Sequence, residues 1–211
     1  NRAVMNTSVM KNIHITSEGV KGVSSFPQPR RILLFSGKRK SGKDYITDIL
    51  QKKFDSSQCV TMKISGPIKS HWAKLLNLDL KELLGDGEYK EKYRRDMIIW
   101  SEDMRKKDYT YFCRAAIDMY IAGDVPIWIV SDIRRKTDLK WFAENFGSAC
   151  KTIRISADDE VRSKRGWVFT PGIDDSESEC NLDDVNKWDL EILNNDDNID
   201  DIISSILKLV E

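Results

Sequence analysis

The sequence predicts an α/β domain in which helices cover both faces of a five-stranded parallel sheet. Two observations lead to this prediction. Apolar segments of strand length alternate with segments of helical periodicity from about Arg30 to the end of the chain, an alternation typical of parallel sheets. A glycine-containing loop, Gly37 to Asp44, also joins the first predicted strand to the first predicted helix. The chain has 211 residues, which is enough for one domain with a sizeable core.

The predicted strands are short apolar runs. Arg31 to Ser36 has the composition of a buried strand, and so does the run from Ile127, which Pro126 introduces. The five expected strands span residues 31–36, 59–64, 127–131, 151–155 and 190–193.

The predicted helices follow from apolar residues at helical spacing. Ile46, Leu50 and Phe54 share one face after the first loop. Another helix is expected to begin at Ser65-Gly66-Pro67, because proline fits the first turn of a helix. Further helices are expected at residues 88–107 and 110–122, around 139–146, and at 199–209.

The first 29 residues differ from the rest of the chain. They are polar, contain Ser and Gly, and close with Pro27 and Pro29. Such a composition predicts a disordered N-terminal extension over residues 1–29. Residues 30–211 are then expected to form the folded domain.

The loop between the first strand and the first helix reads Gly-Lys-Arg-Lys-Ser-Gly-Lys-Asp over residues 37–44, and it matches the phosphate-binding pattern G-x-x-x-x-G-K. A helix start leaves backbone N–H groups unpaired and has a partial positive charge, so this arrangement favours phosphate oxygens. Lys43 is expected to reach the β- and γ-phosphates of a nucleotide. The three cations Lys38 to Lys40 suit a site that holds several phosphate charges. The alternative is a basic surface turn.

Two aspartates are candidate ligands for Mg²⁺. Asp44 stands where Ser or Thr usually provides the hydroxyl that binds the ion. A carboxylate there could bind Mg²⁺ directly or through water. Asp132 follows the strand predicted at 127–131, and at that strand end it could bind the ion, orient a water or accept a proton.

Arg134 and Arg135 come immediately after this strand end. Guanidinium groups suit bidentate binding of phosphate or carboxylate. The alternative is a structural salt bridge with a helix-capping aspartate.

A second basic cluster contains Arg162, Lys164 and Arg165, directly before Gly166. Cations flanked by glycine are typical of a mobile lid that closes over phosphates and excludes water. We therefore expect a basic lid over about residues 158–172, with exposed cations that lack structural partners when the site is empty. The alternative is a basic surface helix followed by a packed Trp-Phe turn.

Composition excludes several classes of protein. The net charge is zero, which argues against general nucleic-acid binding. The longest apolar stretches are of strand length, so no membrane span is expected. The four cysteines lack metal or redox spacing and are expected to be reduced. Residues 174–201 contain twelve acidic residues and one basic residue, Lys187, and we expect this acidic stretch to be a solvated surface.

One further match is interpreted as coincidence. Asn186-Lys187-Trp188-Asp189 has the N-K-x-D pattern that reads guanine in GTPases. In those proteins the pattern follows a strand, whereas here a predicted strand comes after it. The chain also lacks a D-x-x-G motif.

Taken together, these residues resemble the animal-type phosphomevalonate kinases. The resemblance rests on GKRKSGKD after an apolar strand, SGPIK (Ser65 to Lys69), YKEKYRRDMIIW (Tyr89 to Trp100), VSDIRR (Val130 to Arg135) and RGWVFTPGIDDSESEC (Arg165 to Cys180). It implies a P-loop kinase with the nucleoside monophosphate kinase fold and a lid. The implied reaction transfers phosphate from ATP to (R)-5-phosphomevalonate, giving ADP and (R)-5-diphosphomevalonate, in the mevalonate route to isoprenoids and sterols.

The resemblance also implies roles for individual residues. Lys43, Arg39 and Arg134 are the candidate catalytic residues, and Arg134 is expected to bind the acceptor phosphate. The expected ATP-binding residues are Lys38, Arg39, Lys40, Ser41, Gly42, Lys43, Asp44 and Asn194. The expected substrate-binding residues are Arg105, Arg134, Arg135, Arg154, Arg165 and Asn195. Asn195 stands where relatives have His.

The expected cofactors are ATP and Mg²⁺, and the expected partners are small molecules, with no nucleic acid and no membrane. We also expect a monomer. The chain ends Leu209-Val210-Glu211 instead of with the peroxisomal tripeptide of some relatives, which favours the cytoplasm. From the residues alone, three alternatives stay open: a nucleoside monophosphate kinase, another P-loop kinase for a small anion, and a GTPase-like switch or nucleotide-sensing module.

Overall fold

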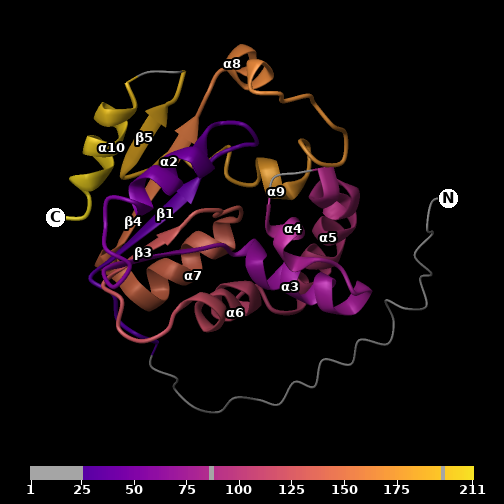
Figure 1. Cartoon of the computed structure of the whole chain (residues 1–211), viewed down its shortest axis with the longest axis horizontal. Helices are drawn as coiled ribbons and strands as arrows, with labels where there is room; N and C mark the ends of the chain where they lie inside the picture. The colour runs from indigo at the N-terminus through magenta and orange to yellow at the C-terminus, as the bar shows by residue number, and fades with distance from the viewer. Residues whose placement is uncertain (1–25, 86–87, 196–197) are drawn as a thin grey trace.

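The computed structural model describes residues 26–85, 88–195 and 198–211, and it contains the predicted five-stranded parallel sheet (Figure 1). The strands are β1 (Arg31–Ser36), β2 (Cys59–Met62), β3 (Ile127–Val130), β4 (Cys150–Ser156) and β5 (Leu190–Leu193). They are hydrogen-bonded in the order β2-β3-β1-β4-β5, and every pair is parallel. The sheet is therefore built as the alternation of strand and helix signals predicted.

Helices connect these strands. They are α2 (Lys43–Gln51), α3 (Ser65–Leu76), α4 (Leu80–Leu84), α5 (Glu88–Lys107), α6 (Tyr111–Tyr120), α7 (Lys136–Phe146), the 3₁₀-helix η1 (Gly147–Ala149), α8 (Asp159–Lys164), α9 (Glu177–Cys180) and α10 (Ile199–Leu207). The long helix predicted at 88–107 is confirmed at both ends. The short helices α4 and α9 were not predicted, because four or five residues are too few to display a helical period.

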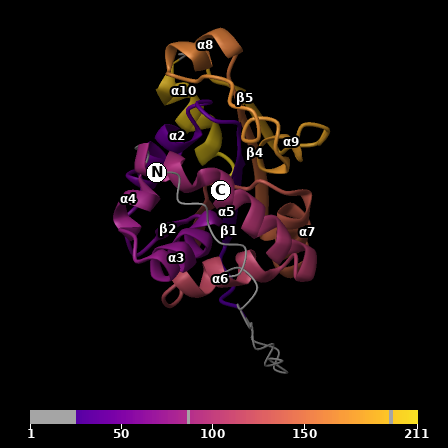
Figure 2. The same ribbon diagram turned by 90° about the vertical axis from the view of Figure 1, so that its right-hand side faces the viewer.

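The sheet separates two apolar clusters. Figure 2 shows the helices that cover them, with α2 and α10 above α3 and α6 in that view. Side chains alternate between the faces of a strand, so Leu33 and Phe35 of β1 pack with α2 and α10, whereas Ile32 and Leu34 pack with α3, α5, α6 and α7. All four side chains are essentially inaccessible to solvent. Each buried side chain of this size stabilises the fold by roughly 1.5–3 kcal/mol. Burial on both faces explains why β1 is a continuous apolar run.

Most element boundaries agree with the sequence prediction to within two residues, and two differences have a clear physical reason. The second strand ends at Met62 and not at Ile64, because Ile64 has helical torsion angles and its N–H bonds to Asp132 at the start of α3. Most of the expected N-terminal extension, residues 1–25, lies outside the described residues. Phe26 was assigned to that extension, yet its ring packs edge-on against Trp141 with 5.4 Å between ring centroids. The packed domain therefore includes Phe26.

The parallel arrangement places the carboxyl ends of all five strands along one edge of the sheet. The loop after β1, the residues after β3 and the residues after β5 meet at this edge. Ligands of open parallel sheets bind at such an edge. Among the described residues, no helix is long and apolar enough to cross a membrane.

Candidate active site

The loop between β1 and α2 has the backbone of a phosphate-binding loop. Gly42 lies directly before α2 with φ of 88°, a left-handed conformation that glycine adopts without strain. A Cβ at this position would also collide with the side chain of Asn194. No side chain caps α2, so the N–H groups of its first turn are available to an anion. The Ser41 hydroxyl beside them is buried without a hydrogen-bond partner, and an orphaned donor here fits phosphate oxygens.

Lys43 lies in the interior of the site. Its Nζ donates to the carbonyl of Ser131, after β3, at 2.5 Å and to Oδ1 of Asp44 at 2.8 Å. Burial lowers the pKa of Lys43, and the neighbouring Asp44 carboxylate opposes this effect. The ammonium is thus held between the phosphate loop and the end of β3, where a transferred phosphate would need charge neutralisation.

Asp44 remains ionised across the physiological range. Its burial would raise its pKa, but the Lys43 ammonium outweighs this effect and lowers the pKa to about 2. Nearly half of its side-chain surface is exposed, so a cation can reach it. Asp132 is less available, because its two oxygens accept the N–H groups of Ile64 at 2.5 Å and Ser65 at 3.0 Å. Among the described residues, no group of three or more His, Cys, Asp or Glu side chains is arranged to hold a metal ion.

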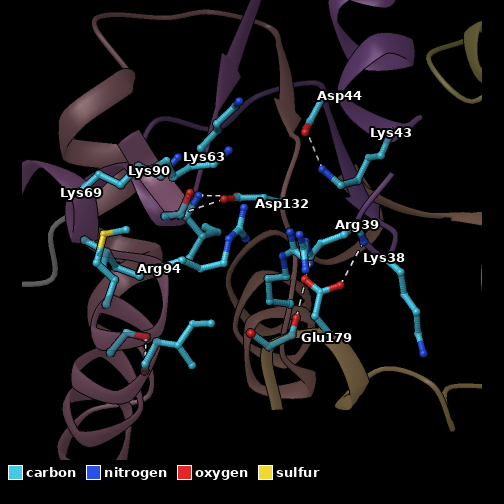
Figure 3. Close-up of a pocket in the computed structure, with 18 of the residues that line it drawn as sticks. Lys38, Arg39, Lys43, Asp44, Lys63, Lys69, Lys90, Arg94, Asp132 and Glu179 are labelled. Carbon is cyan, nitrogen blue, oxygen red and sulfur yellow. Dashed lines mark hydrogen bonds and ion pairs between the residues drawn. The ribbon is translucent and has the colours of Figure 1, made fainter. Parts of the chain in front are cut away.

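A cavity of about 320 Å³ extends from this loop. Figure 3 shows Lys43 and Asp44 on one side of it, Lys63, Lys69 and Lys90 on the other, and Asp132 between them. The side lined by the phosphate loop is called the donor end below, and the side lined by Lys63, Lys69, Lys90 and Arg94 is called the acceptor end. The cavity is also lined by Ile64, Ile68, Met97, Ile98, Arg105, Arg134 and Arg135.

The acceptor end is strongly cationic, and sequence reasoning did not assign it. Lys69 lies on α3 and is only 8% exposed. Burial, together with the neighbouring cations Lys90, Lys63 and Arg94, lowers its pKa to about 8, and Asp132 offsets this only in part. Arg94 on α5 donates two hydrogen bonds to Glu91, at 2.8 and 2.6 Å. The only sequence signal for these residues was that three of them lie in the SGPIK and YKEKYRRDMIIW motifs.

Three of the predicted substrate-binding arginines line the cavity wall. Arg105 on α5 donates to Oδ1 of Asp138 at 2.6 Å, and Asp138 is fully buried. Arg135 pairs with Glu102 of α5 through its side chain. Arg134 donates from Nη1 to Oε1 of Glu179 at 2.5 Å. The carboxylates fix the direction of each guanidinium, so the arginines are held in place before any ligand arrives.

The acidic stretch is a solvated surface only in part, because most of its described carboxylates are exposed as expected but Asp174 and Glu179 are not. Several of its carboxylates reach back to cations of the donor end, over 135 or more residues of chain. Asp174 accepts from Arg39 at 2.8 Å and Glu179 from Arg134, while Asp183 accepts from Lys38 at 2.6 Å. Asp174 and Glu179 are buried. The prediction was wrong for these two residues, because charge composition cannot indicate which distant partners a carboxylate meets.

The predicted lid, residues 158–172, is docked on the phosphate loop. Arg162 is buried, donates from Nε to the carbonyl of Arg39 at 2.9 Å, and stacks over Trp167. Arg165 donates to the carbonyls of Ser41 at 3.2 Å and Asn194 at 2.9 Å. The expectation that these cations are exposed and lack partners is therefore wrong, because carbonyl oxygens of the loop supply acceptors. Lys164 is exposed as expected, and opening of the lid stays a prediction.

The remaining predicted residues lie outside the cavity lining. Asn194, after β5, is buried and donates from Nδ2 to the carbonyl of Ser41 at 2.9 Å, so it supports the phosphate loop from behind. Arg154 bonds to Ser36 and Asp183. Asn195 makes two hydrogen bonds with Asp158 before α8, at 3.0 and 2.8 Å. Direct ligand contacts for Arg154, Arg165 and Asn195 stay predictions that require movement of the lid.

The N-K-x-D match has a structural role. The Asp189 carboxylate accepts the N–H and the hydroxyl of Thr152 at 2.7 and 2.9 Å, joining β5 to β4. Asp189 is not among the residues that line the cavity. Interpreting the match as coincidence agrees with this position.

The fold and the site together define a phosphotransferase of the P-loop class. A solved structure of similar fold is the APS kinase of Mycobacterium tuberculosis in complex with AMPPNP and APS. It has a TM-score of 0.50 and 15% sequence identity, and the alignment covers 87% of this chain and 99% of that one. At this identity the similarity supports the fold alone.

Sequence comparison identifies the family within this class. The profile described as phosphomevalonate kinase matches residues 35–148. The phosphomevalonate kinase of Drosophila melanogaster is 51% identical over 179 residues, which cover 84% of this chain and 94% of the fly protein. The chain belongs to the phosphomevalonate kinase family.

Proposed function

We propose that the chain transfers the γ-phosphate of ATP to (R)-5-phosphomevalonate, giving ADP and (R)-5-diphosphomevalonate. The observation that supports this most directly is the cavity with a cationic group at each end. A phosphate-binding loop lies at one end and the cluster of Lys63, Lys69, Lys90 and Arg94 at the other. Such a cavity suits an acceptor that is negatively charged at both of its ends, as phosphomevalonate is.

At the donor end, the phosphate loop holds the ATP phosphates. The N–H groups at the start of α2 and the Ser41 hydroxyl donate to them, and Lys43 neutralises charge on the transferred group. Phosphoryl transfer through a loose transition state depends on positioning and charge neutralisation more than on covalent chemistry. The buried, fixed position of Lys43 meets that requirement.

Mg²⁺ fits this donor end as a bound cofactor. It needs few protein ligands, since it usually binds one or two carboxylates together with phosphates and water. Asp44 is ionised and accessible, so it would hold the ion, whereas both oxygens of Asp132 already accept backbone hydrogen bonds. When bound, the ion would neutralise phosphate charge beside Lys43.

The acceptor lies between the two ends. Its phosphate faces the donor end, where Arg134 has only Nη1 engaged in a hydrogen bond to a side chain among the described residues. Its carboxylate faces Lys69 and the other cations of the acceptor end. Ile64, Ile68 and Met97 supply an apolar wall for its methyl group. The attacking phosphate is largely ionised at neutral pH, so no strong base is needed, which agrees with the stacking of His71 on Trp100 instead of in a catalytic position.

A nucleoside monophosphate kinase is the alternative within the same class. Its acceptor has one charged end and one uncharged base. The acceptor end here contains four cations, and an uncharged base would supply no negative charge to the buried Lys69. A nucleotide switch would need no acceptor end at all.

A coupled assay of ADP formation tests the proposal. The acceptor panel contains (R)-5-phosphomevalonate, unphosphorylated mevalonate, AMP and UMP, each with ATP and Mg²⁺. ADP release is expected with phosphomevalonate at a kcat/KM at least ~100-fold above that for the others. Preference for a nucleoside monophosphate, or nucleotide binding with no acceptor-dependent release, would overturn it. The expected monomer is a separate proposal, which light scattering of the purified chain tests.

A further inference from the structure

Glu179 joins the two sides of the site where the reaction takes place. It lies on α9, is 6% exposed, and uses both carboxylate oxygens. Oε1 accepts from Nη1 of Arg134 at 2.5 Å, and Oε2 accepts the backbone N–H of Arg39 at 3.0 Å. Figure 3 shows this carboxylate directed at Arg39 from below the cavity. The residue thus contacts the phosphate loop and the acceptor-binding arginine at the same time.

These two contacts connect parts of the protein that otherwise depend on different strands. Arg39 belongs to the loop after β1, and Arg134 follows β3. The two strands are neighbours in the sheet. Beyond β3, the Ile133 N–H bonds to the carbonyl of Phe35 at 2.9 Å and the Ser131 carbonyl accepts from Lys43, but neither bond includes the Arg39 backbone or the Arg134 guanidinium. Glu179 comes from a segment about 140 residues after the loop. It fixes the loop backbone and the guanidinium relative to each other.

The charge of Glu179 is also important for Arg134. Burial alone would lower the pKa of Arg134, and the Glu179 carboxylate is the foremost of the groups that reverse this and raise it. Asp132 and Asp44 add to the effect. One donor of the guanidinium, Nη1, is taken by Glu179, and its Nε and Nη2 make no hydrogen bond to the described residues. The planar group therefore has a set direction with two donors still available.

We propose that Glu179 is a positioning residue for phosphoryl transfer. It holds the Arg134 guanidinium and the phosphate loop at Arg39 in a fixed position relative to each other. The proposal rests on the proposed function, because that function places donor and acceptor phosphates on these two groups. Glu179 itself contacts neither phosphate. It acts by holding Arg134 so that Nε and Nη2 meet the acceptor phosphate in line with the donor.

This role predicts a separation of kcat from KM. Misplacement of a positioned group by about 1 Å can reduce turnover ~100-fold. Removal of the Glu179 charge also removes a repulsion that the anionic acceptor meets in the ground state. Loss of the carboxylate should therefore reduce kcat while the KM for the acceptor stays unchanged or falls. A residue that only stabilised the fold would reduce the amount of folded protein, and kcat per folded molecule would be unchanged.

The first test is Glu179→Gln, which keeps the shape but offers one acceptor where two are used. Glu177→Gln is the matched control, because Glu177 is exposed on the same short helix and its side chain accepts a hydrogen bond from Asn181. We expect kcat of Glu179→Gln to fall at least ~10-fold with no rise in acceptor KM, and the control to match the wild type. A kcat within twofold of the wild type would overturn the proposal, and so would a rise in acceptor KM at unchanged kcat.

A double-mutant cycle with Arg134→Gln tests whether Glu179 acts through Arg134. Groups in direct contact show non-additive effects, whereas independent groups add. We expect the double variant to lose no more turnover than Arg134→Gln alone, because the carboxylate then has no guanidinium to orient. A double variant whose loss equals the product of the two single losses would contradict the mechanism.

Glu179→Asp decides the matter if the glutamine variant does not fold. It keeps the charge, but its side chain is one methylene shorter and cannot reach both donors. We expect kcat to fall by a factor of up to ~100. An unchanged kcat in folded protein would overturn the proposal. Hydrogen exchange of the backbone amides at residues 38–42 and the affinity for ATP can both be measured without an acceptor. We expect faster exchange in the Glu179 variants and wild-type exchange in the Glu177→Gln control. This measurement still tests the proposal if the wild type proves to use another acceptor.

Discussion

The two ends of the cavity differ in how their positive charges are paired with carboxylates. At the donor end, the protein supplies a carboxylate for nearly every cation: Asp183 for Lys38, Asp174 for Arg39, Asp44 for Lys43 and Glu179 for Arg134. At the acceptor end, Lys69 is buried, and the neighbouring Lys90, Lys63 and Arg94 lower its pKa while Asp132 only partly offsets them. The cations of the donor end are thus largely paired before ligand binds, whereas Lys69 at the acceptor end makes no ion pair with the described residues.

This difference indicates how each end contributes free energy to catalysis or to binding of the acceptor. Carboxylate partners at the donor end hold cations in fixed directions, so little reorganisation remains for the reaction. Cations that repel one another at the acceptor end destabilise the empty protein and gain most when an anion arrives. Substitutions at the donor end should therefore act on kcat, and those at the acceptor end on the acceptor KM.

The largest effect is expected for Lys43→Met at the donor end. Removal of a fixed stabilising charge costs roughly 3 kcal/mol, so turnover should fall at least ~100-fold with the fold intact. Steady-state kinetics and circular dichroism measure the two quantities. Lys53→Met, an exposed change just beyond the same helix, is the control. Near-normal turnover in folded Lys43→Met would mean that the loop does not hold the transferred phosphate.

Arg134→Lys is expected to reduce kcat ~10- to 100-fold although the charge is kept. An ammonium cannot hold Glu179 with one donor and face the acceptor phosphate with a planar pair. Initial rates at saturating ATP and acceptor give kcat, and Arg114→Lys on the exposed face of α6 is the control. If the kinetics of Arg134→Lys are those of the wild type, fixed direction at the donor end has no importance.

At the acceptor end, Lys69→Met should raise the acceptor KM about 10-fold and leave the ATP KM unchanged. The same change should stabilise the protein, because a pKa lowered from 10.5 to about 8 corresponds to a cost on the order of 3 kcal/mol at neutral pH. Kinetics and thermal unfolding measure both effects, with exposed Lys74→Met on the same helix as the control. A lowered melting temperature together with an unchanged acceptor KM would contradict the contrast between the ends.

The pH dependence of Lys69 gives a sharper form of this test. In the free enzyme it loses its proton near pH 8, so kcat/KM for the acceptor should decline above that pH. The unfolded chain binds the proton up to about pH 10.5, so the contribution of Lys69 to the free energy of unfolding rises between pH 8 and 10.5. Lys69→Arg stays charged and should abolish both changes. A decline that is the same in Lys69→Arg would assign it to another group.

The smallest effect is expected for Arg165→Ala in the lid. Its hydrogen bonds to the phosphate loop and to the Asn194 carbonyl are partly exposed and contribute about 1 kcal/mol net. The ATP KM should rise about 5-fold, and hydrogen exchange at residues 158–172 should become faster in the ligand-free protein. Lys164→Ala on the same helix is the control. Equal exchange in both variants would mean that Arg165 does not hold the lid on the loop.

The parts of the molecule that the sequence predicted are those determined by contiguous residues. The strand at Arg31–Ser36 is an apolar run, and the helix at Glu88–Lys107 has a period that extends over twenty residues. The phosphate loop is a pattern of eight consecutive positions, so Lys43 and Asp44 could be placed at the site from spacing alone. Local geometry determines each of these features.

The parts that were missed depend on distant contacts. The segment that contains Asp174, Glu179 and Asp183 was interpreted as solvated, because nothing in its composition shows that its carboxylates meet Lys38, Arg39 and Arg134. Arg162 was interpreted as exposed for the same reason. Lys69 and Lys90 lie on two different helices and face one cavity only after the chain has folded. No periodicity connects them.

The order of the strands gives the site a length scale. The loop after β1 begins the donor end, the residues after β2 begin the acceptor end, and β3 lies between these two strands. Adjacent strands are about 4.8 Å apart, so the two ends are separated by roughly 10 Å of sheet. A five-carbon chain extended between its carboxylate and its phosphate is of comparable length. The strand spacing therefore sets the length of acceptor that can contact both ends. An acceptor shortened by two methylenes could reach the cations of only one end at a time.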